Sequence, residues 1–370
     1  MKIALFTTAY PNENNYYNHG FIHSRVIEYM KKNINLKMDI FVVNRNKKLE
    51  KYVYEGVQVY SGNKKVIEKI FNINEYHKIV VHFLDHKIID ILNKLKPKKE
   101  ILVWVHGHEA LSWRRRQFNK NENNFYKYII SNKLQLYKMK KFVQNHSHVK
   151  YIFVSNWMKK VMEQDVKVRV NDYVIIPNVI NTDYFSYQKK NVEDRTKILT
   201  IRPFTSRKYA TDIVTKAIEE LSKEFEYFNE LSFTIIGKGP LFEEDTSSIK
   251  YLENVELINK FIHPKEIKEY HKKNGIFLIP TRQDSQGVSM CEAMSSGLVP
   301  IASNNTAIPE FLNEKAGYLT NNINEVKNAI IDLYYNKEKF LDKSKHSSKI
   351  ILEKCSPEKT IDVEYELIMK

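Results

Sequence analysis

The chain has 370 residues, a formal net charge of +15 at pH 7 and two cysteines. This length exceeds what one ordinary hydrophobic core holds and fits two α/β domains, while two cysteines are too few for a disulfide framework or a zinc site. No apolar run approaches the roughly 20 residues of a membrane-spanning helix, and the start lacks the pattern of a secretory signal, so we expect a cytoplasmic protein.

The first predicted elements are a strand over residues 1–7 and, after a polar loop, a helix from about Phe21 to Lys32. Gly20 stands at the entrance to this helix. The N–H groups of a first helical turn attract anions, and a residue without a side chain lets a sugar or phosphate come close. Gly20 is therefore a candidate donor-binding residue, although a plain polar loop explains the same sequence.

The predicted strand Ile101–Val105 is followed by His106-Gly107-His108-Glu109. An imidazole at a strand end can donate a hydrogen bond to a sugar hydroxyl or exchange a proton near neutral pH. His106 is therefore a candidate for the reaction, with His108 the weaker choice. The alternative is a satisfied polar residue without a role.

Positive charge is concentrated in the first half. Residues 1–188 hold 32 Lys and Arg against 16 Asp and Glu, whereas residues 189–370 hold 27 against 28, so the halves carry +16 and −1. A helix is predicted from about Asn124 to Asn145, with lysines at Lys138 to Lys141. Its apolar residues include Phe125, Ile129, Ile130, Tyr137 and Phe142. Such a helix could lie on an anionic membrane surface or guide a phosphate-bearing acceptor.

Just before this helix, Trp113 adjoins Arg114, Arg115 and Arg116. The indole ring could stack on a sugar while the arginines hold an anionic acceptor, so these four residues are candidates for acceptor binding. A Trp at the edge of the core is the alternative.

In the second half, the predicted strand Ile198–Ile201 leads into Arg202 and Lys208, and the strand Phe233–Ile236 leads into Gly237 and Gly239. Two fixed cations after a strand can neutralise the charge that grows on a leaving group. A solvated basic loop would explain the cations equally, and strand-end turns also use glycine pairs.

The most informative loop joins a predicted strand, Gly275–Pro280, to a predicted helix, Val288–Ser296. Gly287 lets the backbone approach a ligand, and the N–H groups of Val288 and Ser289 at the helix start would attract a phosphate. Glu292, further along the helix, could accept hydrogen bonds from a ribose diol, and Asp284 could hold the hydroxyls of a sugar. The arrangement suits sugar transfer from a nucleotide, although carboxylates occur in many such loops.

This segment resembles the donor-binding signature of the retaining glycosyltransferases of family 4, in which a carboxylate precedes a glutamate by eight positions and an Ala-Met-Ala/Ser-x-Gly-x-Pro run follows. The matching residues are Glu292, Ala293, Met294, Ser295, Gly297 and Pro300. Two positions depart from the pattern: Asp284 stands for the first glutamate, and Gln286 replaces the usual aromatic residue.

The resemblance extends to other segments in the order that the family requires. It implies that Arg202 and Lys208 grip the donor diphosphate, that Gly237 and Gly239 form a floor under the nucleotide, and that His106 sits beside the transferred sugar. YIFVSNWMKK, with Ser155 as a helix N-cap, and IIPNVINTDYF also resemble family segments.

The implied fold is α/β of the GT-B type, with two facing Rossmann-like domains, parallel sheets and an interdomain cleft. We place an acceptor-binding domain at residues 1–188 and a nucleotide-sugar-binding domain at residues 189–355. Residues 356–370 are expected to form a helix that packs back on the first domain.

The implied activity is retaining transfer of a hexose-type sugar from a nucleotide-diphosphate sugar to a glycan or lipid-linked acceptor, in bacterial capsule, lipopolysaccharide or teichoic-acid synthesis. We expect no cofactor and no metal, a location in the cytoplasm or on the inner face of the cell membrane, and no nucleic-acid partner. The alternatives are a nucleotide-sugar 2-epimerase, a non-catalytic binding subunit and a DNA glucosyltransferase.

Overall fold

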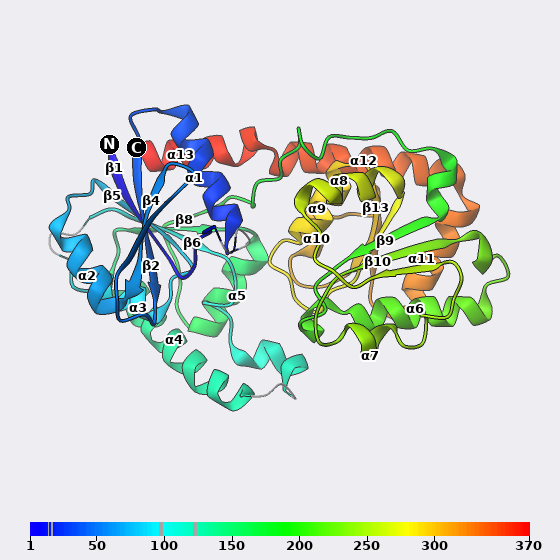
Figure 1. Ribbon diagram of the computed structural model, residues 1–370, viewed down its shortest axis with the longest axis horizontal. Helices are drawn as coiled ribbons and strands as arrows, with labels where there is room; N and C mark the ends of the chain where they lie inside the picture. The colour runs from blue at the N-terminus through cyan, green and yellow to red at the C-terminus, as the bar shows by residue number, and fades with distance from the viewer. Residues whose placement is uncertain (14, 16–17, 96–98, 121–123) are drawn as a thin grey trace. The chain divides into compact units, whose positions relative to one another are not determined.

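The computed structural model describes residues 1–13, 15, 18–95, 99–120 and 124–370. The chain forms two compact units (Figure 1). The first comprises Met1–Gln117, Glu122–Ile176 and Ile361–Lys370, and the second comprises Pro177–Thr360 with Phe118–Asn121.

The first unit is built on a sheet with the strand order β3-β4-β2-β1-β5-β6-β7-β8. All neighbouring strands in this sheet are parallel except β3 and β4. The strands are β1 (Lys2–Thr7), β2 (Lys37–Asn44), β3 (Glu50–Tyr54), β4 (Val57–Asn63), β5 (Lys78–His82), β6 (Ile101–Val105), β7 (Val149–Phe153) and β8 (Tyr173–Ile175). The helices are α1 (Gly20–Lys32), α2 (Lys64–Ile73), α3 (His86–Leu92), α4 (Phe125–Asn145), α5 (Asn156–Val166) and α13 (Ile361–Met369), with a 3₁₀ helix, η1, at Trp113–Asn119.

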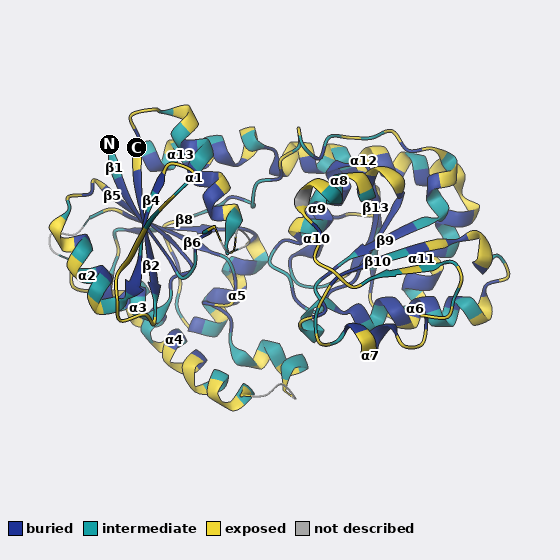
Figure 2. Cartoon of the chain, viewed as in Figure 1, coloured by how far each residue is buried: buried dark blue, intermediate teal, exposed yellow. Residues whose placement is uncertain are grey.

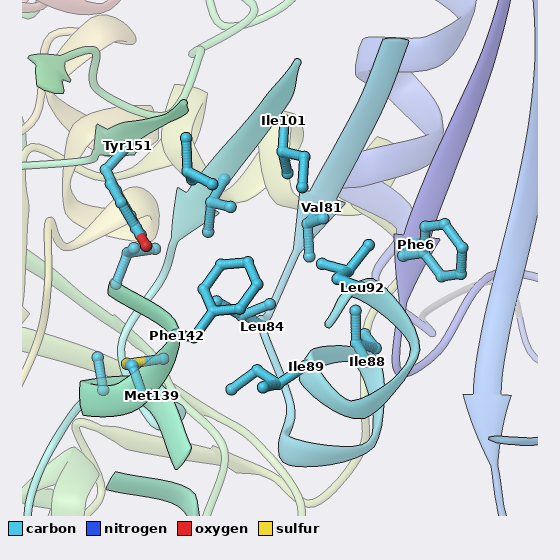
Figure 3. Packing of buried hydrophobic residues seen from close by; sticks show 14 of the residues in the cluster. Phe6, Val81, Leu84, Ile88, Ile89, Leu92, Ile101, Met139, Phe142 and Tyr151 are labelled. Atoms are coloured by element: carbon cyan, nitrogen blue, oxygen red, sulfur yellow. The ribbon is translucent and has the colours of Figure 1, made fainter. Parts of the chain in front are cut away.

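The central strands β5 and β6 are buried along their whole length, in keeping with the apolar runs Ile79–Val81 and Ile101–Val105. Figure 3 shows how α3 and α4 cover one face: Ile88 and Leu92 of α3 and Phe142 of α4 pack beside Val81 and Ile101 on the strands. The covering helices keep their outer surfaces exposed (Figure 2).

The second unit has a parallel sheet with the order β11-β10-β9-β12-β13-β14. Its strands are β9 (Lys197–Ile201), β10 (Ser232–Ile236), β11 (Val255–Ile258), β12 (Ile276–Ile279), β13 (Val299–Ser303) and β14 (Tyr318–Thr320). Its helices are α6 (Thr211–Glu224), α7 (Phe242–Thr246), α8 (Pro264–Lys273), α9 (Val288–Ser295), α10 (Ile308–Phe311), α11 (Ile323–Tyr335) and α12 (Lys337–Cys355), with short 3₁₀ helices η2 (Val192–Thr196), η3 (Arg207–Tyr209), η4 (Phe228–Glu230) and η5 (Pro357–Lys359).

Each sheet reverses its winding direction once, and this fixes where a ligand can bind. In the first sheet the reversal lies between β1 and β5, and in the second between β9 and β12. At such a point the loops from the carboxyl ends of two adjacent strands diverge and leave a crevice. The sequence-predicted site residues follow these strands or their neighbours.

Local predictions agree closely with the elements. The strand Ile101–Val105 has the predicted bounds, and the predicted helix 124–145 is α4. Ser155 caps α5 by accepting a hydrogen bond from the N–H of Met158 at 3.1 Å. Cys291 is fully buried, as expected of a small core residue.

The division of the chain differs from the predicted boundary after residue 188. Residues 177–188 belong to the second unit, because hydrogen bonds tie them to its loops and helices. The hydroxyl of Ser295 donates to the carbonyl of Phe185 at 2.7 Å, and the N–H of Gln188 donates to the carbonyl of Ser296 at 3.3 Å. The polar stretch after Phe185 is thus a surface segment of the second unit and not the division itself.

The C-terminal helix belongs to the first unit from Ile361, five residues beyond the predicted start at 356. Glu364 of α13 is fully buried and holds the helix in place. Its carboxylate accepts hydrogen bonds from Arg25 Nε at 3.2 Å, from the Tyr29 hydroxyl at 2.6 Å and from Trp104 Nε1 at 2.9 Å. Among the described residues, no helix combines the length and hydropathy needed to cross a membrane.

Candidate active site

The crevice of the second unit brings Arg202 and Asp284 together. Arg202 is the first residue after β9, and Asp284 lies in the loop that follows β12. The two strands are neighbours in the sheet, so their carboxyl ends open on the same crevice. Arg202 Nη1 lies 4.0 Å from Asp284 Oδ2. Residues far apart in the sequence thus form a cation–carboxylate pair at the predicted place.

Arg202 is buried with much of its hydrogen-bonding capacity unused. Its exposed fraction is 5%, and within the described part of the chain neither Nε nor Nη2 has a hydrogen-bond partner. Burial lowers the pKa of the guanidinium, and Asp284 partly opposes this shift. Guanidinium groups still keep their charge at neutral pH, and a buried charge without full hydrogen bonding is costly. The side chain is therefore poised to receive an anion.

Lys208 shares an aromatic neighbour with Arg202. Its Nζ lies 5.4 Å from the ring centroid of Tyr209, and the guanidinium carbon of Arg202 lies 5.5 Å from the same centroid. Tyr209 thereby supports both cations, a role that sequence reasoning missed because nothing but adjacency to Lys208 marks this residue. The expected pair of cations does converge.

The loop carrying Lys208 is fastened to the loop after β12. The N–H of Arg282 donates to the carbonyl of Lys208 at 2.9 Å, and Arg282 Nη1 donates to the carbonyl of Arg207 at 2.7 Å. Arg207 in turn pairs with Asp245 and Glu244. These contacts fix the position of the loop after β9 relative to the loop after β12.

Gly237 and Gly239 lie directly against the loop that follows β9. A Cβ at Gly237 would collide with the carbonyl oxygen of Arg202, and a Cβ at Gly239 would collide with the backbone of Phe204. The N–H of Phe204 donates to the carbonyl of Lys238 at 3.1 Å. Glycine is therefore required at both positions for packing against the backbone that carries Arg202.

The start of α9 is shaped by Asp284. Its Oδ1 accepts hydrogen bonds from the N–H of Gln286 at 3.2 Å and from that of Gly287 at 2.8 Å. Gly287 is the N-cap with φ of +82°, a conformation that favours glycine. No side chain caps the helix, so the N–H groups of Val288 and Ser289 remain available to an anion. The short Asp284 side chain is well suited to this turn.

Glu292 lies one turn inside α9. Burial raises the pKa of its carboxyl group to about 7, and within the described residues its carboxylate takes part in no hydrogen bond or ion pair. The side chain is half-buried, so a ligand can still reach it. A carboxylate in this state favours hydrogen-bond donors such as the two hydroxyls of a ribose.

The side chain of Gln286 forms hydrogen bonds to the protein backbone. Its Oε1 accepts a hydrogen bond from the N–H of Asn178 at 2.6 Å, and its Nε2 donates to the carbonyl of Asn178 at 3.0 Å. The same Nε2 contacts the Cys355 sulfur at 3.8 Å. This use explains the amide at a position where the resembling family carries an aromatic residue. The function of Gln286 had no signal in the sequence, since its partners lie far away along the chain.

Comparisons with known proteins agree with this geometry. Residues 195–336 match the family model described as "Glycosyl transferases group 1". A segment is 27% identical over 112 residues to the sulfoquinovosyl transferase SQD2 of Arabidopsis thaliana, covering 29% of this chain and 22% of that protein. This chain thus spans less than a quarter of the curated relative.

Solved structures of glycosyltransferases resemble the whole chain. Sucrose-phosphate synthase from Thermosynechococcus elongatus has a TM-score of 0.77 at 13% identity, covering 100% of this chain and 98% of the other. A glycosyltransferase from Rickettsia africae has a TM-score of 0.71 at 14% identity, covering 100% and 98%. With two parallel-sheet α/β units, the chain has the predicted GT-B fold, and the family match over residues 195–336 agrees with the predicted transferase.

In the first unit of this GT-B chain, His106 follows β6 and lies among aromatic rings. The ring centroid of Phe83 is 4.5 Å away and that of Phe21 is 5.1 Å away. Burial, followed by the charges of Arg25 and His19, lowers the pKa of His106 well below 6.5. His106 is therefore neutral near neutral pH, so of its two suggested uses the hydrogen bond fits and proton exchange does not.

The turn after β6 is held by Glu109, which sequence reasoning left without a role. Its buried carboxylate accepts hydrogen bonds from the N–H of His106 at 2.6 Å and from that of Gly107 at 3.0 Å. A carboxylate four residues beyond a strand end is the signal that could have indicated this turn. His108 is more exposed, with its Nδ1 3.7 Å from Glu109.

Gly20 is the first residue of α1, and a Cβ there would meet no atom within 4 Å. The strained position is instead its neighbour His19, the N-cap, with φ of +53°. His19 stacks on Phe83 at 4.3 Å, and burial lowers its pKa to about 4. The backbone therefore places no demand for glycine at residue 20.

The four acceptor candidates lie on η1 with different surroundings. Arg114 is exposed and lies over the Trp113 ring at 5.8 Å. Arg115 is paired with Asp165 at 2.8 Å, and Arg116 lies over the ring of Tyr128 at 5.8 Å. Of these four residues, Arg114 is thus the most accessible to a ligand. Within the described residues, no group of three or more His, Cys, Asp or Glu side chains could hold a metal ion.

Proposed function

We propose that the protein is a retaining glycosyltransferase that moves a hexose-type sugar from a nucleotide-diphosphate sugar to a hydroxyl of a glycan or lipid-linked acceptor. The observation that carries this proposal is the buried, incompletely bonded guanidinium of Arg202, which lies 4.0 Å from Asp284 at the reversal point of the second sheet. Such a cation beside an uncapped helix start suits a diphosphate.

In the proposed reaction the acceptor oxygen bonds to the anomeric carbon on the face from which the diphosphate leaves. The bond between that carbon and the phosphate oxygen breaks, and the acceptor proton passes to the departing phosphate. Arg202, Lys208 and the N–H groups of Val288 and Ser289 stabilise the charge that develops on the diphosphate. These fixed donors make a metal unnecessary in this scheme.

The remaining residues would hold the donor. Glu292 accepts hydrogen bonds from the ribose, Asp284 contacts the sugar hydroxyls, and His106 donates a hydrogen bond to the transferred sugar. Gly237 and Gly239 maintain the backbone under the nucleotide. Solved relatives of similar fold support this donor class: trehalose-6-phosphate synthase from Escherichia coli was solved with UDP-2-fluoro glucose, and Staphylococcus aureus TarM with α-GlcNAc-glycerol and UDP.

A thermal-shift series with UDP, GDP, ADP and CMP, with and without EDTA, tests the donor site. We expect one nucleotide to stabilise the protein, unaffected by EDTA, with the shift lost in Glu292→Ala. Glu353→Ala removes an exposed carboxylate on α12 and serves as the control that keeps the shift. If none of the nucleotides stabilises the wild-type protein, the proposed donor site is wrong.

The sugar nucleotide of the stabilising base is then incubated with candidate acceptors, and NMR of the product establishes the anomeric configuration. Retention is expected. Inversion would contradict the proposed stereochemistry. Consumption of the donor without acceptor would indicate the 2-epimerase alternative, and binding without turnover would indicate a non-catalytic subunit.

We further propose that α4 places the enzyme on an anionic membrane surface at the inner face of the cell membrane, near a lipid-linked cell-envelope acceptor. The helix contains no Asp or Glu, and its lysines include Lys127, Lys133 and Lys141. Large apolar side chains are exposed along it: Tyr126 (74%), Ile130 (55%), Leu134 (45%) and Tyr137 (61%). Of the apolar set predicted from sequence, Phe142 instead packs in the core.

Liposome flotation at low salt tests this surface. Neutral vesicles are compared with vesicles that contain an anionic phospholipid, and only the anionic vesicles are expected to carry the protein. The double variant Leu134→Asn with Tyr137→Asn should lose binding, whereas Leu352→Asn, an exposed leucine on α12, should retain it. Equal binding to both vesicle types would contradict the proposal.

A further inference from the structure

Two histidines of the first unit share a hydrogen bond that the proposed reaction does not yet use. His82 ends β5 and His106 directly follows β6, the neighbouring parallel strand. His82 Nδ1 lies 2.9 Å from His106 Nε2. The rings are nearly parallel, with an interplanar angle of 18° and a centroid distance of 5.1 Å. Each imidazole therefore restricts the orientation of the other.

The contact contains a single proton. Burial lowers the pKa of His82 well below 6.5, with His106 and Arg25 contributing further, and the pKa of His106 is shifted in the same direction. Both rings are therefore neutral near neutral pH, and a neutral imidazole carries one N–H and one acceptor nitrogen. One ring donates to the other, so fixing the tautomer of one fixes that of its partner.

The surroundings of His82 Nε2 decide which of the two histidines donates the hydrogen bond. His82 is fully buried, stacked on Trp104 at a centroid distance of 4.9 Å, and its Nε2 has no hydrogen-bond partner within the described part of the chain. If His106 donated, the His82 proton would lie on Nε2 as a buried N–H without an acceptor, which folded proteins rarely tolerate. If His82 donates from Nδ1, only a lone pair stays unused.

We propose that His82 is a positioning residue that holds His106 in the tautomer with its proton on Nδ1. His82 Nδ1–H donates to His106 Nε2, and His106 then presents a neutral N–H donor at Nδ1. No hydrogen bond in the described part of the chain uses this Nδ1, so it is left for a ligand. The matching ligand group is an acceptor oxygen, such as that of a sugar hydroxyl; its contact with the transferred sugar rests on the proposed function.

The surroundings keep the presented N–H in place. Phe21 and Phe83 lie against the His106 ring, and Glu109 accepts hydrogen bonds from the N–H groups on either side of the His106 Cα. Because His106 stays neutral, its donor capacity should not change across the range of pH in which an ordinary histidine titrates. His106 would therefore act as a hydrogen-bond donor at all pH values near neutrality and not as a base.

NMR of the full-length protein labelled with ¹⁵N-histidine tests the tautomer directly and needs no substrate. Long-range ¹H–¹⁵N spectra distinguish protonated from unprotonated ring nitrogens, and His106→Asn assigns the signals. We expect His106 to be protonated on Nδ1 from pH 6 to 8. Protonation on Nε2 in the wild-type protein would overturn the proposal, whatever the activity of the enzyme.

Two variants separate positioning from packing. His82→Asn keeps an amide N–H near the place of Nδ1 and should preserve the His106 tautomer. His82→Phe removes the donor, so His106 should then also populate the tautomer with its proton on Nε2. With the identified donor and acceptor, His82→Phe should lower kcat by about two- to tenfold, the effect of one neutral hydrogen bond, with little change in donor KM.

His82→Asn should recover most of that loss, and His346→Phe, an exposed position on α12, is the control. An unchanged His106 tautomer in a folded His82→Phe protein would contradict the positioning role. If the wild-type protein transfers no sugar, the proposed function fails but the NMR result still decides the tautomer.

Discussion

Arg202 is a buried cation that, in the function we propose, is kept for an anionic ligand at a cost to stability. Its guanidinium is removed from water, yet it has one carboxylate at 4.0 Å and two nitrogens without partners in the described structure. A protein selected only for stability would replace such a group or complete its hydrogen bonds. Glu292 of α9, whose carboxyl pKa is raised by burial, likewise has no hydrogen-bond or ion-pair partner for its carboxylate among the described residues.

Arg202→Met should make the free protein more stable by about 1–3 kcal/mol, because an incompletely compensated buried charge is replaced by an apolar chain of similar length. The same change should abolish stabilisation by the nucleoside diphosphate and lower kcat on the order of 100-fold. Thermal unfolding and steady-state kinetics measure both effects.

Arg195→Met is the matched control, since Arg195 donates to the carbonyls of Tyr334 at 2.8 Å and Val192 at 3.0 Å. That substitution should destabilise the protein. A loss of stability in Arg202→Met comparable to that in Arg195→Met would contradict the account of Arg202.

Nucleotide affinity should depend on the ionisation of Glu292. The pKa of its carboxyl group is about 7 in the free protein, and the hydroxyls of a ribose favour the ionised form. Affinity is therefore full above pH 7 and falls below it, by up to tenfold per pH unit. Calorimetric titration at pH 6 and pH 8 measures the change.

Glu292→Gln should bind more weakly at pH 8 and lose this part of the pH dependence, which separates it from the titration of the nucleotide itself. The same pH dependence in wild type and Glu292→Gln would show that Glu292 does not contact the ligand.

Among elements, the loops that follow β9 and β12 are joined by the hydrogen bonds of Arg282. Gln286 in turn connects the start of α9 to Asn178. The N–H of Ile180 also donates to the carbonyl of Cys355 at 2.8 Å, next to the sulfur that Gln286 contacts. The loop between β12 and α9 is therefore tied both to the segment that enters the second unit and to the end of α12. This connection explains why residues 177–188 fold with the second unit.

Gln286→Ala should lower the free energy of unfolding by about 1–3 kcal/mol, since two hydrogen bonds between the Gln286 amide and the backbone of Asn178 are lost. Hydrogen exchange at the Asn178 amide should accelerate at the same time. Gln188→Ala is the control, because among the described residues the Gln188 amide makes only long contacts, at 3.4 and 3.5 Å to Ser186. Unchanged exchange at Asn178 in Gln286→Ala would show that the amide does not hold this segment.

For the whole molecule, buried neutral histidines set how stability depends on pH. The pKa is lowered to about 4 for His19 and about 3 for His271, and it lies well below 6.5 for His82 and His106. Below pH 6.5 the unfolded chain binds protons at these four residues and the folded chain does not. Glu292 acts in the opposite direction, since its raised pKa lets the folded chain hold one proton more.

The net difference near pH 5.5 is about three protons in favour of the unfolded chain, so stability should fall on acidification from pH 7 to pH 5 by on the order of 3 kcal/mol per pH unit. Thermal unfolding across this range measures it. His271→Phe should reduce the slope, and the exposed His346→Asn should not. A midpoint that stays constant or rises on acidification would contradict this assignment.

The sequence by itself determined most of the elements and which residues are candidates for the site. Strands such as β6 and helices such as α4 and α9 follow from local apolar patterns and from glycines, which act within a few residues. Arg202, Asp284 and Glu292 were likewise recognisable because their spacing from strand ends and glycines is a local property.

Only the tertiary structure decided the burial and the hydrogen-bond partners of those residues. The orphaned nitrogens of Arg202, the amide of Gln286 on Asn178 and the proton shared by His82 and His106 depend on strand neighbours and chain crossings that no local pattern encodes. The boundary after Ile176 and the burial of Glu364 against Arg25 have the same origin. Hydrogen bonds and desolvation act between atoms that are close in space, and parallel sheets bring together residues that are distant in sequence.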